Sequence, residues 1–336
     1  MDNLKMVQGT DKPQVYIIIL NYNRWSDCIE CIEDIFKSTY SNYQIVLIDN
    51  NSPNNSINFI ESWAKGDLKF DIPDNIPLKN LYYPEIKKPI PYIIYSKTEA
   101  ENGGNTEKEK DLKSLNSELK INPLIIIQTG ENIGFGAGNN VALRMILKRN
   151  DGDYIWLLNP DRVIENNTLD NLIKFANSNQ NSIIGLTVKD YLFPEKIIFY
   201  GGSKINPYLG TITHITKKEN LDTIDFISGG SLLTCTNNFK INGLLPEEYF
   251  LYWEETDWCT KAKMNNIKLS VCLDAVSYDK GSTSIGKGYL AEYYYTHNAL
   301  KYFYKYNKTK IKFILLANIL RITKRFYKLK FQNISA

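Results

Sequence analysis

Three apolar runs in the first half of the chain are each followed by amide, carboxylate or glycine residues. Asparagine and aspartate side chains suit the edges of a nucleotide base and the hydroxyl groups of a ribose, and glycine lets backbone amides approach a ligand closely. Tight turns explain the glycines equally well, and no Gly-Lys-Ser/Thr follows them, so they do not form a P-loop. We expect a nucleotide site formed by the residues that follow these runs: Asn21, Asn23, Asp49, Asn51, Asn132, Gly134, Gly136, Gly138 and Asn139.

A fourth apolar run, residues 155–158, stops abruptly at Asn159, Pro160 and Asp161. The run predicts a buried strand, and Pro160 fixes the backbone φ angle in the turn that follows it. Asp161 is therefore a single carboxylate at the end of a core strand. It either caps the next turn or takes part in binding and chemistry.

Three more carboxylates, Glu254, Glu255 and Asp257, lie in an acidic loop that leads into an expected helix. A carboxylate at the start of a helix is favoured by the helix dipole, so Asp257 has a structural explanation as well as a chemical one.

The elements that position these residues follow from the apolar patterns. Residues 15–20 and 45–48 are β-branched runs typical of buried strands, and between them apolar residues recur at helical spacing up to residue 36. Ser26 or Asp27 is the expected cap of that helix. The resulting βαβ unit places polar residues at the carboxyl ends of its strands, where open α/β sheets bind ligands.

Two further strands are expected at 124–129 and 155–158, and a helix at 168–177. Together the four strands predict a mostly parallel sheet, and the glycine-punctuated strands after residue 180 predict a mixed or antiparallel extension. The crossover at 66–122 is long. Its second half is polar and highly charged, so we expect an insertion that includes a mobile surface loop.

Composition limits the class of protein. The chain has 336 residues, 43% hydrophobic and 23% charged, which predicts a globular protein of one or two domains. Residues 1–14 do not resemble a secretory signal, and no apolar run is long enough to cross a membrane. Five cysteines without framework spacing indicate reduced thiols in the cytosol, and Cys28 and Cys31 lack the second pair that a zinc site needs.

Charge is divided unevenly along the chain. Residues 301–336 contain ten Lys or Arg and no Asp or Glu, whereas the net charge of the whole chain is +3, so the other 300 residues carry −7. The basic residues alternate with aromatic and aliphatic ones, a composition typical of a helix at an anionic membrane surface. Docking on the chain's own domain is the alternative, and aliphatic content disfavours nucleic acid as the partner.

Six motifs occur in an order that resembles the inverting glycosyltransferases of family 2. They are YIIILNYNR, IVLIDNNS, ENIGFGAGNNVAL, WLLNPD, SGGSLL and YFLYWEETDWC, and the resemblance spans residues 14–306 apart from the insertion. It is strongest to the bacterial rhamnosyltransferase-like members that build O-antigen, capsule or cell-wall glycans. The resemblance implies a GT-A type α/β fold: a Rossmann-like, mostly parallel sheet with a mixed extension.

The resemblance also implies a domain organisation. Residues 1–300 would form the GT-A domain, with a nucleotide-sugar half at 14–165 that contains the insertion at about 66–122, and an acceptor half at 166–300. Residues 301–336 would form a basic amphipathic extension.

The same resemblance assigns a metal site. The family's Asp-any-Asp motif corresponds to Asn159, Pro160 and Asp161, so Asp161 is the expected anionic ligand and Asn159 a contact to the donor. The family's metal-binding histidine corresponds to Asp279, which is still an oxygen ligand suited to Mg²⁺ or Mn²⁺. His297 stands where the family usually has an arginine, and His214 is left unassigned.

The general base of the family is an aspartate that corresponds to Glu255, so this chain would place its base one methylene further out. Glu255 is the first choice, Asp257 the second, and Glu254 the remaining candidate. The base takes a proton from the acceptor hydroxyl opposite the leaving group.

The resemblance implies a metal-dependent inverting glycosyltransferase at the inner face of the cell membrane, with dTDP-rhamnose as the favoured donor. The acceptor would be a surface polysaccharide or a lipid-linked glycan. Two alternatives are kept: a UDP-sugar donor such as galactofuranose, galactose or N-acetylhexosamine, and a non-catalytic scaffold in a polysaccharide assembly complex.

Overall fold

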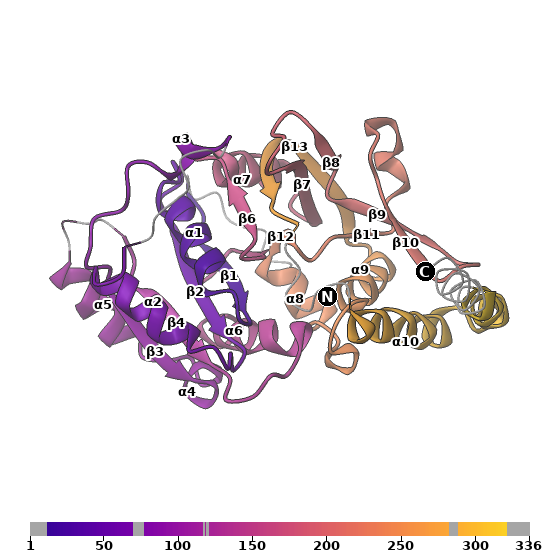
Figure 1. Cartoon of the computed structure of the whole chain (residues 1–336), viewed down its shortest axis with the longest axis horizontal. Helices are drawn as coiled ribbons and strands as arrows, with labels where there is room; N and C mark the ends of the chain where they lie inside the picture. Colours follow the sequence, from indigo (N-terminus) through magenta and orange to yellow (C-terminus); the bar gives the residue numbers. More distant parts are fainter. Residues whose placement is uncertain (1–11, 70–76, 117, 119–120, 282–287, 321–336) are drawn as a thin grey trace, which may run out of the picture.

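The computed structural model describes residues 12–69, 77–116, 118, 121–281 and 288–320. They form a large sheet with helices on both faces and a smaller sheet beside it (Figure 1). The large sheet has the strand order β3-β4-β2-β1-β5-β12-β7-β13-β6, and β8 pairs with β7. Its strands are β1 (Val15–Asn21), β2 (Tyr43–Asp49), β3 (Tyr92–Ser96), β4 (Leu124–Gln128), β5 (Tyr154–Leu158), β6 (Arg162–Ile164), β7 (Ser182–Asp190), β8 (Ile197–Phe199), β12 (Ser231–Cys235) and β13 (Lys268–Asp279).

Five neighbouring strands, β3, β4, β2, β1 and β5, run parallel to one another. Their carboxyl ends therefore meet at one edge of the sheet, which is where the polar motifs lie. Strand β12 is antiparallel to β5 and β7, and β6 is antiparallel to β13. The prediction of an α/β fold with a mostly parallel sheet and a mixed extension is confirmed.

Two apolar cores lie on opposite faces of the sheet, because side chains alternate along each strand. In β1, Ile17 points into one core and Ile18 into the other. The first core is covered by α1 (Trp25–Phe36), α2 (Ser56–Lys65) and α7 (Thr168–Ser178). The second is covered by α4 (Lys97–Glu101), α6 (Phe135–Arg149), α8 (Thr236–Asn242) and α9 (Glu254–Met264).

The remaining elements lie around this frame. A three-stranded antiparallel sheet consists of β9 (Gly202–Asn206), β10 (Thr211–His214) and β11 (Phe226–Ile227). The other helical segments are α3 (Lys79–Tyr82), α5 (Thr106–Leu115), α10 (Tyr289–Tyr306), η2 (Lys218–Thr223), η3 (Glu247–Tyr249) and η4 (Lys308–Lys310).

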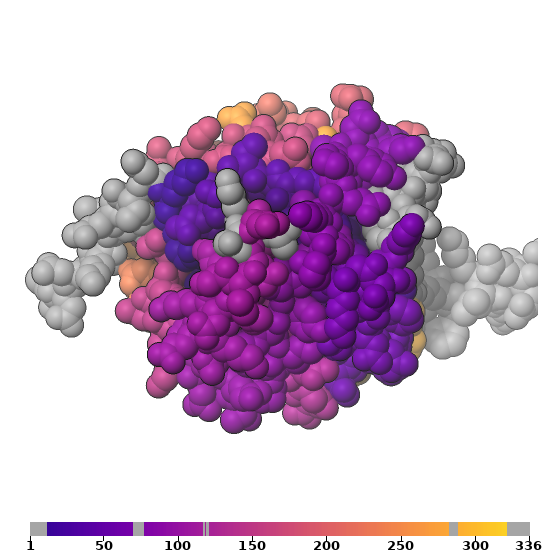
Figure 2. Space-filling view, turned by 90° about the vertical axis from the view of Figure 1, so that its left-hand side faces the viewer, coloured from indigo at the N-terminus to yellow at the C-terminus, as the bar shows by residue number. Residues whose placement is uncertain are grey.

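The segment 66–122 contributes more regular structure than its composition suggests. Strand β3 extends the parallel sheet beside β4. Helix α4 begins with a capping box, in which the Ser96 hydroxyl accepts from the Glu99 amide and the Glu99 carboxylate accepts from the Ser96 amide. Helix α5 is tied to α6 by a 2.6 Å ion pair between Arg149 and Glu109. The prediction of a loop was wrong for α4 and α5, which are helical; a local cap and one ion pair stabilise them. Figure 2 shows the side of the molecule that lies to the left in Figure 1. The first half of the chain, coloured indigo to magenta, forms most of that side.

The start of α1 differs from the prediction. The helix begins at Trp25 with Arg24 in the cap position, so neither Ser26 nor Asp27 caps it. The Asn21 side-chain oxygen instead accepts from the Arg24 amide at 2.9 Å. The strand β1 and the helix α1 are thus joined by a side chain from the end of the strand.

Helix α10 passes through residue 300, where the sequence suggested a boundary between the main domain and the basic extension. Its residues Ala299, Tyr302 and Phe303 pack on Trp253 in a separate small core. Residues 311–320 are also helical, and the rest of the basic extension, from 321 on, lies outside the described residues. Within the described ranges, no helix is both long and apolar enough to cross a membrane.

Candidate functional site

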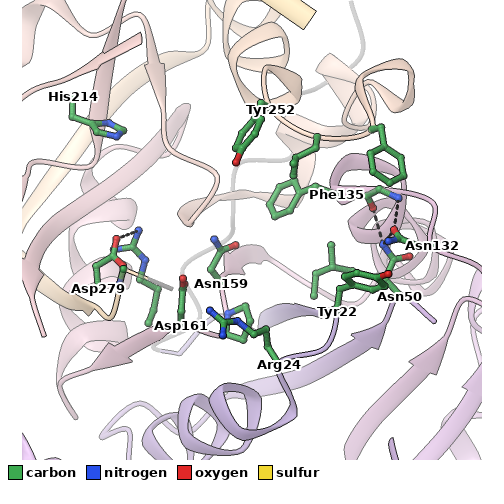
Figure 3. Close-up of a pocket in the computed structure, with 17 residues that line it drawn as sticks. Tyr22, Arg24, Asn50, Asn132, Phe135, Asn159, Asp161, His214, Tyr252 and Asp279 are labelled. Atoms are coloured by element: carbon green, nitrogen blue, oxygen red, sulfur yellow. Dashed lines mark hydrogen bonds and ion pairs between the residues drawn. The ribbon is translucent and has the colours of Figure 1, made fainter. Parts of the chain in front are cut away.

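A pocket of about 400 Å³ opens at the edge where the parallel strands end (Figure 3). Its wall combines the loops after β1, β2, β4 and β5 with β10, the end of β13 and the loop before α9. The residues predicted from the sequence that line it are Asn132, Gly134, Asn159, Asp161 and Asp279. Those that the sequence analysis missed include Tyr22, Arg24, Asn50, Arg162, His214 and Tyr252.

Asn50 organises one end of the pocket. Its side-chain amide donates to the Asn132 side-chain oxygen at 2.9 Å and to the Gly134 carbonyl at 3.1 Å, and its oxygen accepts from the Ile133 amide. These contacts fix the loop after β4 against the loop after β2. Gly134 has φ +87°, and a Cβ there would lie 2.3 Å from the Phe250 carbonyl oxygen, so no other residue fits this position.

Asn21 and Asp49 were both expected to contact a nucleotide, but their side chains are hydrogen-bonded to each other beneath the pocket. The Asn21 amide donates to Asp49 at 2.7 Å, and the Ser52 hydroxyl donates to the same carboxylate at 2.6 Å. Both residues are buried and neither lines the pocket. Their contacts hold the ends of β1 and β2 together, and this supports the wall without requiring them to touch a ligand.

Five other residues expected at the nucleotide site also lie outside the lining: Asn23, Asn51, Gly136, Gly138 and Asn139. The Asn23 amide donates to Ser52 at 2.9 Å, and the Asn139 side chain donates to the Phe135 carbonyl inside α6. Asn51 is exposed and has φ +59°, so the chain turns sharply there. This turn brings Asn50, rather than the residues on either side of it, into the wall.

The opposite end of the pocket is charged. Asp161 and Asp279 both line it, and Arg162 pairs with Asp279 at 2.9 Å. The second oxygen of Asp279 accepts from the Gly281 amide at 2.7 Å. Burial raises the pKa of Asp161; the negative charges of Asp279 and Asp27 raise it further, while Arg162 and Arg24 lower it.

This end of the pocket meets part of the requirement for a divalent cation. Two carboxylates converge, and the raised pKa of Asp161 indicates a place where a nearby positive charge would favour the ionised form. Among the residues that the structure describes, however, no group of three or more His, Cys, Asp or Glu could hold a metal ion. The carboxylates of Asp161 and Asp279 are suited to Mg²⁺ or Mn²⁺, but a bound ligand or water must supply the remaining oxygen ligands.

His214 enters the pocket from the small antiparallel sheet, on the same side as Asp279 (Figure 3). Its Nδ1 is hydrogen-bonded to the Ser203 hydroxyl at 2.7 Å, and its ring stacks on Phe199 at 4.3 Å. Loss of water around the ring lowers the pKa of His214, and the charge of Arg162 lowers it further. No local pattern marks His214, because its position depends on the folding of a distant hairpin. His297 is exposed on α10, outside the lining.

The three acidic candidates lie in the first turn of α9, and none of them lines the pocket. Both oxygens of Asp257 are occupied: it accepts from Tyr249 at 2.7 Å, Tyr306 at 2.7 Å and Lys305 at 2.8 Å. Asp257 therefore joins α9 to α10. These contacts leave it poorly placed to accept a proton from a ligand in the pocket.

Glu254 and Glu255 are close to the pocket wall. A Cβ built on Gly229 would lie 3.3 Å from Phe135, which lines the pocket, and 3.6 Å from Glu255. Burial raises the pKa of Glu255, and backbone amides, including that of Gly229, lower it in part. Burial and the charge of Glu255 raise the pKa of Glu254 well above its ordinary value. One of these two carboxyl groups therefore tends to stay protonated, and the other can accept a proton.

Comparison with known proteins gives one family match and two curated relatives. Residues 16–73 match the family model described as Glycosyl transferase family 2. The low-salt glycan biosynthesis hexosyltransferase Agl10 of Haloferax volcanii is 29% identical over 45% of this chain and 50% of its own length. The rhamnosyltransferase WbbL of Escherichia coli is 27% identical over 42% of this chain and 58% of its own length. The chain thus spans about half the length of the curated relatives it matches.

Two solved structures resemble the fold. The mannosyltransferase PcManGT from Pyrobaculum calidifontis, in complex with GDP-Man and Mn²⁺, has a TM-score of 0.53 and 14% identity, covering 91% of this chain and 69% of its own. GalNAc-T7 with UDP, GalNAc and Mn²⁺ has a TM-score of 0.55 and 11% identity, covering 86% and 48%. Both likenesses concern the fold alone. Together, the match over residues 16–73 and the two relatives make the chain similar to glycosyltransferases of family 2, and its architecture is that of the GT-A fold.

Proposed function

We propose that this protein transfers a sugar from a nucleotide-diphosphate donor to a glycan acceptor with inversion at the anomeric carbon. The observation that carries the proposal is the two-ended pocket. Amides from the loops after β2 and β4 form one end, and Asp161, Asp279 and Arg162 form the other. Amides are suited to the nucleotide base and charged groups to the diphosphate. The two ends lie side by side at the carboxyl edge of a parallel sheet, where such sheets bind nucleotides.

At the charged end, Asp161 and Asp279 would hold Mg²⁺ or Mn²⁺. When bound, the cation would neutralise charge on the departing diphosphate. Asn159 lines the same end and is suited to a donor contact through its amide. Mn²⁺ in the two similar structures supports a divalent cation here.

Glu255 is the proposed general base, and Glu254 its buried neighbour. Two observations support Glu255 over Asp257: its pKa is raised, and it adjoins Gly229, which also adjoins Phe135 of the lining. The oxygens of Asp257 are bound by α10 and Tyr249. Glu255 would take the proton of the acceptor hydroxyl as the bond to the sugar forms. Asp257 would act as a positioning residue that fixes the first turn of α9.

A dTDP-rhamnose donor and a surface polysaccharide or lipid-linked acceptor are favoured. The likeness to a rhamnosyltransferase supports the donor, while the likeness to a hexosyltransferase keeps UDP-hexoses as the alternative. The test is turnover of a panel of dTDP-, UDP- and GDP-sugars with Mn²⁺, in the presence of lipid-linked acceptors. Absence of turnover and of binding for every donor would exclude the proposal.

We also propose a peripheral location at the inner face of the membrane. Near the described end of the chain, exposed Phe313, Leu315 and Leu316 lie among five lysines between residues 301 and 312. Apolar side chains among cations are suited to an anionic bilayer. Sedimentation with vesicles tests this: binding to anionic but not to neutral vesicles is expected, and equal or no binding to both would contradict it.

A further inference from the structure

Arg162 is a buried cation in the wall of the pocket. It begins β6, directly after Asp161, and its register partner in β13 is Asp279. Its side chain is only 7% exposed, yet the residue contributes to the pocket lining.

The guanidinium group of Arg162 has fewer partners than its donors require. Its Nη2 pairs with Asp279 at 2.9 Å, while Nε and Nη1 have no hydrogen-bond partner within the described part of the chain. A guanidinium has five N–H donors, and burying such donors without partners is costly. The guanidinium group of Arg162 can therefore bind a second anion.

Arg162 shares the charged end of the pocket with Asp161 and His214. Gly230 leaves the guanidinium uncovered by a neighbouring side chain, because a Cβ there would lie 2.9 Å from Nη2. The other arginine of the lining, Arg24, has Asp27 at 3.4 Å and lies closer to the surface.

We propose that Arg162 is a phosphate-binding residue that recognises the diphosphate of the donor even when no divalent cation is present. The inference rests on the proposed function and identifies the residue by which the pocket recognises phosphate. An arginine keeps its charge at all physiological pH values, and its planar donors match phosphate oxygens. In the absence of ligand, Asp279 holds Arg162 in position; a diphosphate provides the second anion that its donors lack.

The test compares ligands with and without phosphate in the full chain. Calorimetry with Mn²⁺ first identifies which of UDP, dTDP and GDP binds best, and the same diphosphate and its nucleoside are then titrated in EDTA. The wild-type protein is expected to bind the diphosphate at least about tenfold more tightly than the nucleoside, as for a charge-assisted contact. Equal affinities in EDTA would overturn the inference. If no diphosphate binds even with Mn²⁺, it is the proposed function that fails.

Variants then assign the preference to Arg162. Arg162→Gln should lose the preference for diphosphate over nucleoside in EDTA, and Arg162→Lys should keep part of it. Arg149→Gln is the matched control, since Arg149 is 4% exposed and paired with Glu109, and it lies outside the pocket lining. An unchanged preference in Arg162→Gln would refute the assignment.

A double variant separates phosphate binding from simple neutralisation of Asp279. If Arg162 only masks that carboxylate, Asp279→Asn combined with Arg162→Gln should restore the wild-type preference in EDTA. We expect the double variant to show no preference for diphosphate over nucleoside, whereas Asp279→Asn alone should keep or increase that preference. The double variant removes the Asp279 carboxylate together with its arginine partner, so it also serves if Arg162→Gln alone does not fold. Restored preference would overturn the proposal.

Discussion

Asp257 of α9 and Lys305 of α10 form a 2.8 Å ion pair, and Tyr249 and Tyr306 donate to the same carboxylate. Asp257 is fully buried, whereas the Lys305 side chain is about half exposed. The contact joins the helix that carries the proposed base to the helix that begins the basic extension.

Replacing Asp257 with alanine is expected to lower the free energy of unfolding by about 2 kcal/mol, because two tyrosine hydroxyls and a lysine lose their partner. Thermal or urea unfolding measures this loss. Lys305→Ala, which removes the more exposed partner, should cost less than about 1 kcal/mol. If Asp257→Ala is as stable as the wild type yet inactive, Asp257 would be the base rather than a positioning residue.

Glu255→Gln is expected to lower kcat by about 100-fold or more without raising KM for the donor, because a general base acts only in the transition state. Its stability should not fall, since the change removes a buried carboxylate. Glu254→Gln is the matched control on the same helical turn. A large loss of kcat in Glu254→Gln, with Glu255→Gln active, would exchange their roles.

The rate should also depend on pH through Glu255. A base works when it is ionised, and burial raises the pKa of Glu255. The acidic limb of the kcat profile should therefore fall at a higher pH than for an ordinary glutamate, and activity should increase as the pH rises through it. A rate that stays constant down to the ordinary glutamate range would contradict this assignment.

Asp161→Asn is expected to abolish most of the stimulation by Mn²⁺, by about 100-fold, because the amide cannot supply an anionic ligand. Its stability at neutral pH should stay the same or increase, since burial raises the pKa of Asp161 and its ionised form is disfavoured. A manganese titration of activity, with thermal unfolding alongside, measures both effects. Full stimulation in the variant would exclude Asp161 as the ligand.

Asn50→Ala should weaken nucleoside binding by about tenfold and destabilise the protein by about 1 kcal/mol, because it removes the contacts that fix the loop after β4. The adjacent Asn51→Ala is the control, since Asn51 is exposed and outside the lining. Calorimetry with a nucleoside distinguishes the two. Equal effects at both positions would mean that the loop, rather than Asn50, forms the binding surface.

The sequence by itself predicted four of the five neighbouring parallel strands, β1, β2, β4 and β5, whereas β3 lies in the segment interpreted as an insertion. Runs of β-branched residues predict strands wherever the chain supplies them, and their polar ends meet at one edge because parallel strands share a direction. Asp161 could be placed at that edge for the same reason. These inferences depend only on local pattern and on one rule of sheet geometry.

The tertiary structure decided which polar residues face the pocket. Asp49, Asn50 and Asn51 are equivalent in a one-dimensional reading, but the turn at Asn51 and the contacts of Asp49 with Asn21 leave Asn50 in the wall. His214 comes from a separate hairpin. Asp257 receives two of its three partners, Lys305 and Tyr306, from a helix almost fifty residues further along the chain. Such contacts join residues that are distant in sequence, so local composition and spacing carry no signal for them.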